Sequence, residues 1–463
     1  MKKITAVLLT LALVVIMAAG AAVSVYASPS DVPEYIRVGI KSVSDGTTFT
    51  LNSKDGFNIY TYNQTGTCST VKDLSSYQTV SVTAGNPEIS VKDTDGNTLY
   101  SSYNNGTAFI GCTDLIGGIF TDEGTMYRGG LMLYKSESAY KYINVINTEK
   151  YLYGVLPREM SSGYPQEALK AQAVAARTYV AGNIDRKHKD QGFDLCNTQD
   201  CQVYGGVACE APTCTSAVVE TEGMIVYYNG IPAATCVYGS SNGGYIEACR
   251  DIWSADLGYL QGKEDPYDPQ ISWTVKYTKE ELQNKVDAAG FGIGKLTGFS
   301  VLEQTPGGSV TKVELTGTNG SKVLRKSNIL SFFGDSAMKS LHFEVLENEF
   351  DRTVTLPPAF DLKTQLEAGK GLSGLLAMNR SAAENQSGKV SQLYPLSSPD
   401  LFSMSQTVIK PTGIKSDVDG IVLSGKGYGH CLGMSQMGAR EMAKEQFSYE
   451  EILEFYYTGA EVR

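Results

Sequence analysis

The sequence predicts an α+β fold that is rich in strands, with mainly antiparallel sheets around a central alanine-rich helix. Three observations lead to this prediction. Short segments of alternating apolar and polar residues, separated by Asp-Gly turns, occupy residues 35–148. An alanine-rich segment follows at about residues 165–181. After it, two strand-like segments flank Asn229-Gly230, a dipeptide that strongly favours a two-residue hairpin turn.

The first region, residues 28–138, is predicted to form short strands. Asp-Gly turns separate the segments IRVGI, TTFTLNS and FNIYTYN, and the alternation continues through VSVTAG and EISVKD. The region contains no cluster of acid and base side chains and no metal-ligand spacing. We therefore expect it to support the rest of the protein or to position a substrate.

The stretch from Tyr151 to Ala181 contains the candidate catalytic acid. We expect an extended, aromatic-rich run that breaks at Pro157, then Glu159, and then a helix that begins near Pro165 and stops at Gly182-Asn183. A carboxyl group just ahead of a deeply packed helix is held in place and partly desolvated, which catalysis by a single acid requires. The alternative is an ordinary surface glutamate ahead of a core helix.

A hairpin is predicted for Met224–Tyr228 and Ile231–Tyr238, and a glycine-bearing loop follows at residues 240–244. The backbone N–H groups and hydroxyls of such a loop can approach a ligand closely, but the loop can equally be a mobile turn. Trp253 and Tyr259 come next. Their aromatic faces either stack on sugar rings or cover the core.

The remaining chain divides by composition. Residues 139–355 are expected to form the core, residues 356–419 are rich in Pro, Ser, Asn and Gln and read as a flexible insertion, and residues 420–463 complete the core. The last block surrounds His430 with glycines and ends in a helix with a Ser448–Glu451 capping box. Its GKGYGH segment lacks the spacing of a phosphate-binding loop, which excludes a nucleotide site.

The N-terminus and the overall charge define the compartment and the partners. Residues 1–27, with Lys2 and Lys3 ahead of an apolar run, indicate either a cleaved signal peptide or a membrane anchor, so we expect the protein outside the cytoplasm. The net charge is −11 and no dense basic cluster occurs, which argues against nucleic acid and anionic membranes as partners. A neutral glycan is compatible with this charge.

Nine cysteines in an exported chain predict disulfides. Local pairing would join Cys196 to Cys201, Cys209 to Cys214, Cys236 to Cys249 and Cys68 to Cys112, and would leave Cys431 over. Alternatively, a four-thiolate metal site could be formed by Cys196, Cys201, Cys209 and Cys214. Their four-residue spacers are longer than those of zinc knuckles, and an oxidising compartment favours disulfides.

In order, several of these blocks resemble the stage II sporulation protein D family, which includes the amidase-enhancer proteins. The blocks are YLYGVLPREMSSGYPQEALKAQAVAARTYV, CQVYGG, GSSNGGY with DIW, and GKGYGHCLGMSQMGAREMA with SYEEILEFYYTGAEV. The resemblance implies a peptidoglycan-binding protein. In the sporulation branch it implies a lytic transglycosylase that cuts glycan strands stripped of stem peptides during forespore engulfment. The alternative is a non-catalytic wall protein that enhances an amidase, and other engulfment proteins are further partners that the resemblance implies.

The resemblance assigns the catalytic role to Glu159, which acts as both acid and base when a 1,6-anhydro ring closes. A two-carboxylate glycosidase would need a second acid. The motif match and residue polarity give the candidate substrate-binding residues, which are Arg158, Gln172, Arg177, Ser240, Ser241, Gly243, Gly244, His430, Ser435 and Gln436. We expect the C-terminal block to fold back beside the helix and to bring His430 toward Glu159.

The family pattern also bears on metal binding. Some members are thought to bind zinc through His and Cys near the site, but here Gly239 stands where others have His, and Cys431 stands where others have Gly. We assign no metal ligand and no cofactor. Zinc stays open through the residues that remain, Cys236, Cys249, His430 and Cys431.

Overall fold

The computed structural model describes residues 31–350 and 419–463, apart from residues 64, 87, 104–106, 138, 254, 335–336 and 349. The predicted export segment, residues 1–27, and all but the last residue of the predicted insertion, residues 356–419, lie outside the described residues. Within the described ranges no helix is both long and apolar enough to cross a membrane. The α+β prediction is confirmed, since short helices accompany sheets that are mostly antiparallel.

The N-terminal part is a β-sandwich. Its strands are β1 (Tyr35–Val43), β2 (Thr48–Ser53), β3 (Phe57–Tyr62), β4 (Cys68–Leu74), β5 (Thr79–Ala84), β6 (Ile89–Lys92), β7 (Thr98–Ser102), β8 (Ala108–Cys112), β9 (Ile119–Asp122), β10 (Thr125–Arg128), β11 (Gly130–Lys135) and β12 (Tyr140–Asn147). One sheet has the order β13-β1-β12-β11-β8-β3-β4, and its edge strand β13 (Leu195–Cys196) comes from a later part of the chain. The other sheet has the order β10-β9-β2-β5-β6-β7. A buried cluster that includes Phe49, Phe57 and Val82 fills the space between them, as expected for alternating strands.

The centre of the protein is helical. Its helices are α2 (Thr148–Glu159), α3 (Gln166–Asn183), α4 (Pro212–Glu220), α10 (Gln436–Lys444) and α11 (Tyr449–Tyr456). The alanine-rich α3 contacts all four of the others, and Ala168, Ala171, Ala173, Ala175 and Ala176 are fully buried. Because alanine side chains are small, the neighbouring backbones pack close to α3. The prediction of a central alanine-rich helix is confirmed, and so is the Ser448–Glu451 capping box of α11.

The predicted extended run ahead of Glu159 is wrong, because these residues form α2. Asn147 caps this helix by accepting hydrogen bonds from the backbone N–H groups of Glu149 and Lys150. Pro157 lies in the last turn of α2, where the helix is about to end and a proline disturbs it little. Residues 151–156 are all buried, so this part of the helix is enclosed on every side. Packing therefore overrides the strand preference of the aromatic residues.

Short elements connect the centre to the rest. They are η1 (Lys189–Gln191), η2 (Val207–Cys209), β14 (Val226–Tyr228), β15 (Ile231–Pro232), β16 (Tyr238–Gly239), β17 (Tyr245–Ile246), α5 (Cys249–Ile252), β18 (Lys263–Glu264), β25 (Met434–Ser435) and β26 (Glu461–Val462). The predicted hairpin is present in a shorter form, with β14 and β15 paired across Asn229 and Gly230, whose φ angles are 52° and 78°. Both angles are those of the expected turn.

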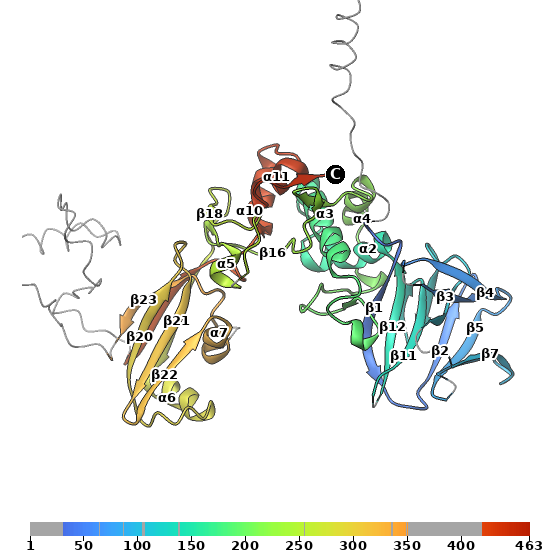
Figure 1. Cartoon of the computed structure of the whole chain (residues 1–463), viewed down its shortest axis with the longest axis horizontal. Helices are drawn as coiled ribbons and strands as arrows, with labels where there is room; N and C mark the ends of the chain where they lie inside the picture. The colour runs from blue at the N-terminus through green and yellow to red at the C-terminus, as the bar shows by residue number, and fades with distance from the viewer. Residues whose placement is uncertain are drawn as a thin grey trace, which may run out of the picture.

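A second lobe has its own core. It contains β19 (Ser272–Thr278), α6 (Lys279–Ala288), β20 (Leu296–Gln304), β21 (Val310–Gly317), β22 (Gly320–Arg325), α7 (Ser327–Phe333), β23 (Phe343–Asn348) and β24 (Gly420–Lys426). Phe299, Phe333 and Leu423 belong to a buried cluster separate from the one around α3. Figure 1 shows this lobe and the sandwich on opposite sides of the central helices.

Candidate functional site

Glu159 is the last residue of α2 and is partly buried. Its Oε1 accepts a hydrogen bond of 2.9 Å from the backbone N–H of Val203, whereas its Oε2 hydrogen-bonds to none of the described residues. Burial raises the pKa of the Glu159 carboxyl group, and this effect is opposed by the Val203 hydrogen bond and by the charge of Arg158. Arg158 is exposed. The carboxyl group is therefore fixed at one oxygen and open to approach at the other.

A buried polar network lies beside Glu159. The Tyr151 hydroxyl donates to Oε1 of Gln202 over 3.2 Å, and Nε2 of Gln202 donates to the Tyr238 hydroxyl over 3.0 Å. The charge of Glu159 raises the pKa of both tyrosines further, after the larger effect of burial. Sequence reasoning missed Gln202 and Tyr238. The one available signal was a Gln beside a Val-Tyr-Gly-Gly segment, which says nothing about its neighbours in space.

Gln172 and Gln436 meet across the centre of the protein. Nε2 of Gln436 donates to Oε1 of Gln172 over 3.2 Å, so α10 lies beside α3 as predicted. Gln172 is fully buried, and its Nε2 lies near the Tyr238 hydroxyl without a well-formed hydrogen bond. This amide is an enclosed donor that belongs to the same polar network.

The Gly-Gly loop, residues 240–244, is held by two buried aspartates that sequence reasoning also missed. Asp268 accepts hydrogen bonds from the hydroxyls of Ser241 and Ser435, over 2.8 and 2.7 Å. Asp265 accepts one from Nδ2 of Asn242 over 2.6 Å. The hydroxyls of Ser241 and Ser435 are thus used within the protein, and both residues are buried.

The other residues of this loop keep part of their surface. Ser240 is partly exposed, and its hydroxyl hydrogen-bonds to none of the described residues. Gly243 and Gly244 have φ angles of 74° and 93°, which L side chains rarely adopt. The Cβ of a side chain at Gly243 would lie 2.9 Å from the backbone nitrogen of Gly427. Gly243 therefore allows the backbone of the Gly-His loop to pack closely, and Gly244 allows the Gln270 side chain to do so.

His430 lies in the Gly-His loop, residues 427–433. Burial lowers the pKa of His430 to about 4, so the ring is neutral at pH 7. Nδ1 accepts a hydrogen bond of 2.9 Å from the Leu432 backbone N–H, which leaves the proton on Nε2, and a hydrogen bond to the Tyr238 backbone opposes the lowering of the pKa. Nδ1 is thus engaged within the loop, and the ring lies beside the Tyr238 backbone of β16.

Arg177 of α3 is fully buried where α3 packs against α2. Its Nε and Nη2 donate to the two carboxylate oxygens of Glu149 over 2.7 and 2.6 Å, and Nη1 donates to the Met224 carbonyl over 3.0 Å. A guanidinium with these partners has no face left for a ligand. We therefore leave Arg177 out of the candidate site.

No disulfide is present, because all nine cysteines carry free thiols. A group suited to a metal ion does exist among the described residues. The ligand atoms of His188, Cys196, Asp200 and Cys201 all lie within 4.8 Å of one another. One nitrogen, two sulfurs and one oxygen fit tetrahedral zinc. The group contains neither His430 nor Cys431, and it shares only Cys196 and Cys201 with the four-thiolate alternative.

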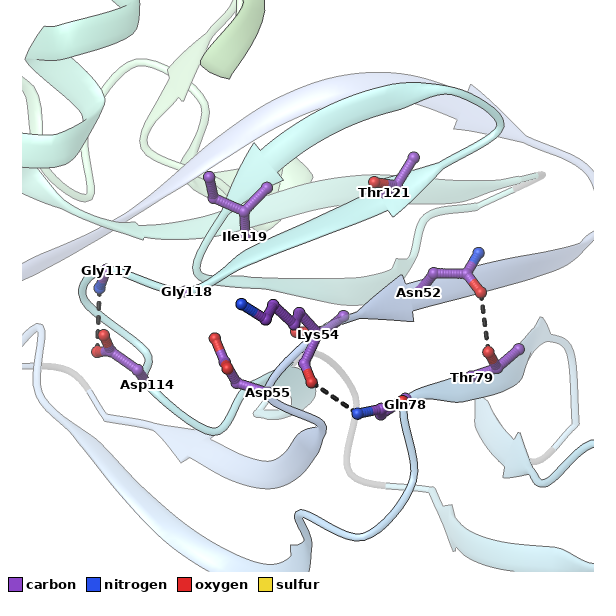
Figure 2. Close-up of a pocket in the computed structure, with 11 residues that line it drawn as sticks. Asn52, Lys54, Asp55, Gln78, Thr79, Asp114, Gly117, Gly118, Ile119 and Thr121 are labelled. Atoms are coloured by element: carbon purple, nitrogen blue, oxygen red, sulfur yellow. Dashed lines mark hydrogen bonds between the residues drawn. The ribbon is translucent and has the colours of Figure 1, made fainter.

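A separate hollow opens on the N-terminal sandwich. It measures about 590 Å³ and is lined by residues such as Asn52, Gln78 and Thr79. Figure 2 shows the Asp55 and Asp114 carboxylates around the same space as the Lys54 ammonium. None of its lining residues belongs to the surroundings of Glu159, and it contains no aromatic side chain.

Comparison with known proteins decides the family. Residues 136–228 match the family model described as stage II sporulation protein. The chain is 32% identical over 310 residues to the amidase enhancer of Bacillus subtilis (strain 168), a match that covers 66% of this chain and 39% of that protein. The chain belongs to the stage II sporulation protein D and amidase-enhancer family.

Two further members of this family match over more of their length. Stage II sporulation protein D of Bacillus subtilis (strain 168) is 26% identical over 345 residues, which is 70% of this chain and 77% of that protein. The protein of the same name from Bacillus amyloliquefaciens is 26% identical over 339 residues, or 68% and 74%. The chain spans well under half of the amidase enhancer. Glu159 and Gln172 lie inside the region matched by the family model, and His430 lies outside it.

Proposed function

We propose that this protein is a peptidoglycan lytic transglycosylase of sporulation that acts outside the cytoplasm on glycan strands stripped of stem peptides. Glu159 is its single acid and base. The observation that carries the proposal is the environment of this carboxyl group, which is partly buried, bound to the Val203 N–H at Oε1, and without a partner at Oε2 among the described residues. Forespore engulfment is the setting that family membership favours.

In the first step, the protonated Glu159 donates its proton to the glycosidic oxygen as the C1–O bond breaks. The raised pKa supports this role because it keeps a larger share of the carboxyl group protonated near neutral pH. The Val203 N–H stabilises the carboxylate that results. It thus limits how far the pKa rises and holds the group in one orientation.

In the second step, the same carboxylate takes the proton of the muramic acid C6 hydroxyl, and the C6 oxygen bonds to C1. A 1,6-anhydro ring forms, the proton returns to Glu159, and no water is consumed. The groups that shift the Glu159 pKa include no other carboxylate of the described residues. This favours a single-acid mechanism over one that needs an acid and a separate base.

A zinc ion in the group of His188, Cys196, Asp200 and Cys201 would have a structural role in this proposal. Cys201 immediately precedes Gln202 and Val203, the two residues that contact the surroundings of Glu159. The chain's own thiols and imidazole would then fix the segment that presents the Val203 N–H. We assign the ion no part in bond cleavage.

The test is mass analysis of products from purified stripped glycan. Wild-type protein should release fragments with 1,6-anhydromuramic ends, and Glu159→Gln should release none while folding normally. Glu222→Gln is the matched control, because Glu222 is exposed and lies outside the site. Full activity in Glu159→Gln would overturn the proposal.

A second function is favoured by one observation, the 32% identity to an amidase enhancer. In this reading the protein binds the wall and stimulates a cell-wall amidase without cutting glycan. Mixing the protein with an amidase and intact peptidoglycan separates the two readings. An enhancer raises amidase turnover equally well in wild type and in Glu159→Gln.

A further inference from the structure

Two large aromatic side chains are left exposed beside the Gly-His loop. Trp253 is 43% exposed and Tyr428 is 50% exposed. Single exposed apolar residues are ordinary on a protein surface, but two exposed aromatic rings at one loop, Tyr428 within it and Trp253 against its His430, are less so. Tyr259, the other aromatic residue that the sequence offered for sugar stacking, is buried, and its hydroxyl accepts a hydrogen bond from the Thr235 N–H.

The backbone fixes where the two rings lie. Gly427, Gly429, Cys431 and Gly433 have φ angles of 80°, 117°, 61° and 62°, so every second residue of the loop is left-handed. A left-handed conformation is strained for Cys431, and strain of this kind is kept where the surroundings hold the backbone. Tyr428 pairs with Ser241 through hydrogen bonds in both directions. The loop is therefore rigid, and Tyr428 is placed by it.

A neighbouring side chain contacts each ring. The Trp253 and His430 ring centroids are 5.3 Å apart with an interplanar angle of 64°, an edge-to-face contact. Nζ of Lys339 lies 5.3 Å from the centroid of the Tyr428 ring. In both cases a neighbour orients the ring while about half of the side chain remains in water.

We propose that Trp253 and Tyr428 form an aromatic platform that stacks on pyranose rings of a glycan strand. The C–H faces of N-acetylated sugars are apolar, and rigid aromatic rings bind them at low cost in conformational entropy. The Ser240 hydroxyl, which is without a partner among the described residues, lies on the loop that pairs with Tyr428 and supplies a polar contact.

This inference rests on the proposed function, because the platform is connected to Glu159 through β16. The Tyr238 side chain belongs to the network beside Glu159, and the His430 ring that contacts Trp253 lies beside the Tyr238 backbone. A strand bound at Glu159 and extended past β16 would meet the platform. Its role is to hold sugars remote from the cleaved bond, so it should matter for long strands and little for short ones.

The chain contains two tryptophans, which makes binding directly observable. Trp273 lies in the second lobe, where Nε1 donates to the Ser340 hydroxyl over 3.4 Å. In a Glu159→Gln background, the hexamer of β-1,4-linked N-acetylglucosamine should shift the tryptophan emission to shorter wavelength. The shift should persist in Trp273→Phe and vanish in Trp253→Phe.

Affinity gives the second readout. Trp253→Ala and Tyr428→Ala should each raise the Kd for the hexamer about tenfold, which corresponds to about 1.4 kcal/mol, and should change the Kd for the dimer little. Trp253→Phe and Tyr428→Phe should retain most of the affinity. Tyr103→Ala is the matched control, since Tyr103 is 69% exposed on the sandwich.

The outcomes separate this inference from the proposed function. Unchanged hexamer affinity in both alanine variants, or no emission shift in Trp273→Phe, overturns the platform even if the wild type cleaves glycan. An emission shift with weakened alanine variants supports the platform even if the wild type cleaves nothing. A lowered melting temperature would reveal misfolding of an alanine variant. In that case the platform is tested by the hexamer affinity of the phenylalanine variants and by the emission shift of Trp273→Phe.

Discussion

The amide nitrogen of Gln436 donates a hydrogen bond of 3.2 Å to the amide oxygen of Gln172, although the two residues are 264 positions apart. This contact joins the last block of the chain to the central helix α3, immediately beside Tyr238. Blocks that are separate in sequence therefore share one polar network at the Glu159 site.

The Gln172–Gln436 pair should behave as a unit in unfolding experiments. Gln436→Leu removes the donor and leaves the buried Oε1 of Gln172 without a partner, so it should lower the free energy of unfolding by about 1–3 kcal/mol. The double variant Gln172→Leu/Gln436→Leu should lose less, since neither polar group remains. Urea denaturation of the four proteins measures the coupling. Strict additivity would show that the contact contributes nothing.

The pH dependence of Glu159 follows from the sign of its pKa shift. Because burial raises the pKa in the folded state, the fold binds this proton more tightly than the unfolded chain does. The stability that this group contributes is present below its ordinary pKa and is lost as the pH rises through the folded-state value. Relative to wild type, Glu159→Gln should therefore gain stability as the pH rises above 4.5, the ordinary pKa of a glutamate, as measured by urea unfolding. Cleavage by wild type should decline over the same rise, and a rate that increases with pH would contradict the acid role.

Gly182 of α3 lies so close to the segment after β15 that there is no room for a side chain at this position. The Cβ of an alanine there would lie 2.4 Å from Cα of Ala234. Gly182→Ala should lower the free energy of unfolding by about 1–3 kcal/mol, the usual range for overpacking. Gly163→Ala is the control, since its Cβ would meet only the Ser161 hydroxyl at 3.7 Å. Equal melting temperatures for the two variants would be inconsistent with this packing.

Zinc should raise the melting temperature of the reduced protein, because a ligand that binds only the folded state stabilises it. The His188, Cys196, Asp200 and Cys201 donor set should bind one ion per chain, as measured by atomic emission after dialysis. Cys201→Ser should lose both the ion and the gain in melting temperature. Cys209→Ser, outside the group, should keep them. Retention of zinc by Cys201→Ser would exclude this donor set as the zinc site. A Cys196–Cys201 disulfide in the isolated protein would instead favour the disulfides predicted from the sequence.

Local patterns were enough for the parts of the fold that depend on local chemistry. The Asn229-Gly230 turn formed with the expected backbone, and α3 begins one residue later and ends two residues later than predicted. The helix α2 was missed because Pro157 and the aromatic residues of its sequence disfavour a helix locally. The helix forms nevertheless, because its residues are buried by the surrounding elements and Asn147 caps its start. The burial depends on parts of the chain that are distant in sequence.

The candidate site was predictable only in part. Glu159 was identified by resemblance, but the group that holds it, the Val203 N–H, comes 44 residues later and carries no side-chain signal. Asp265 and Asp268 are also invisible to pattern reasoning, since an acid buried under a loop reads like any acid in a polar segment. Arg177 shows the converse error. It lies within a matching block and is polar, yet it serves an ion pair inside the fold.

The pairing of β23 with β24 has a consequence for how this protein can change over evolutionary time. Asn348 near the end of β23 pairs with Ile421 near the start of β24, so the two strand ends that precede and follow residues 351–418 lie next to each other. Doubling the length of a flexible connection between such fixed ends costs only about 0.6 kcal/mol. A change in the length of the connection at this position is therefore expected to leave both cores intact. Because β24 runs from this position into the Gly-His loop, a module inserted there would be joined to the sugar-facing surface proposed above through one strand, β24.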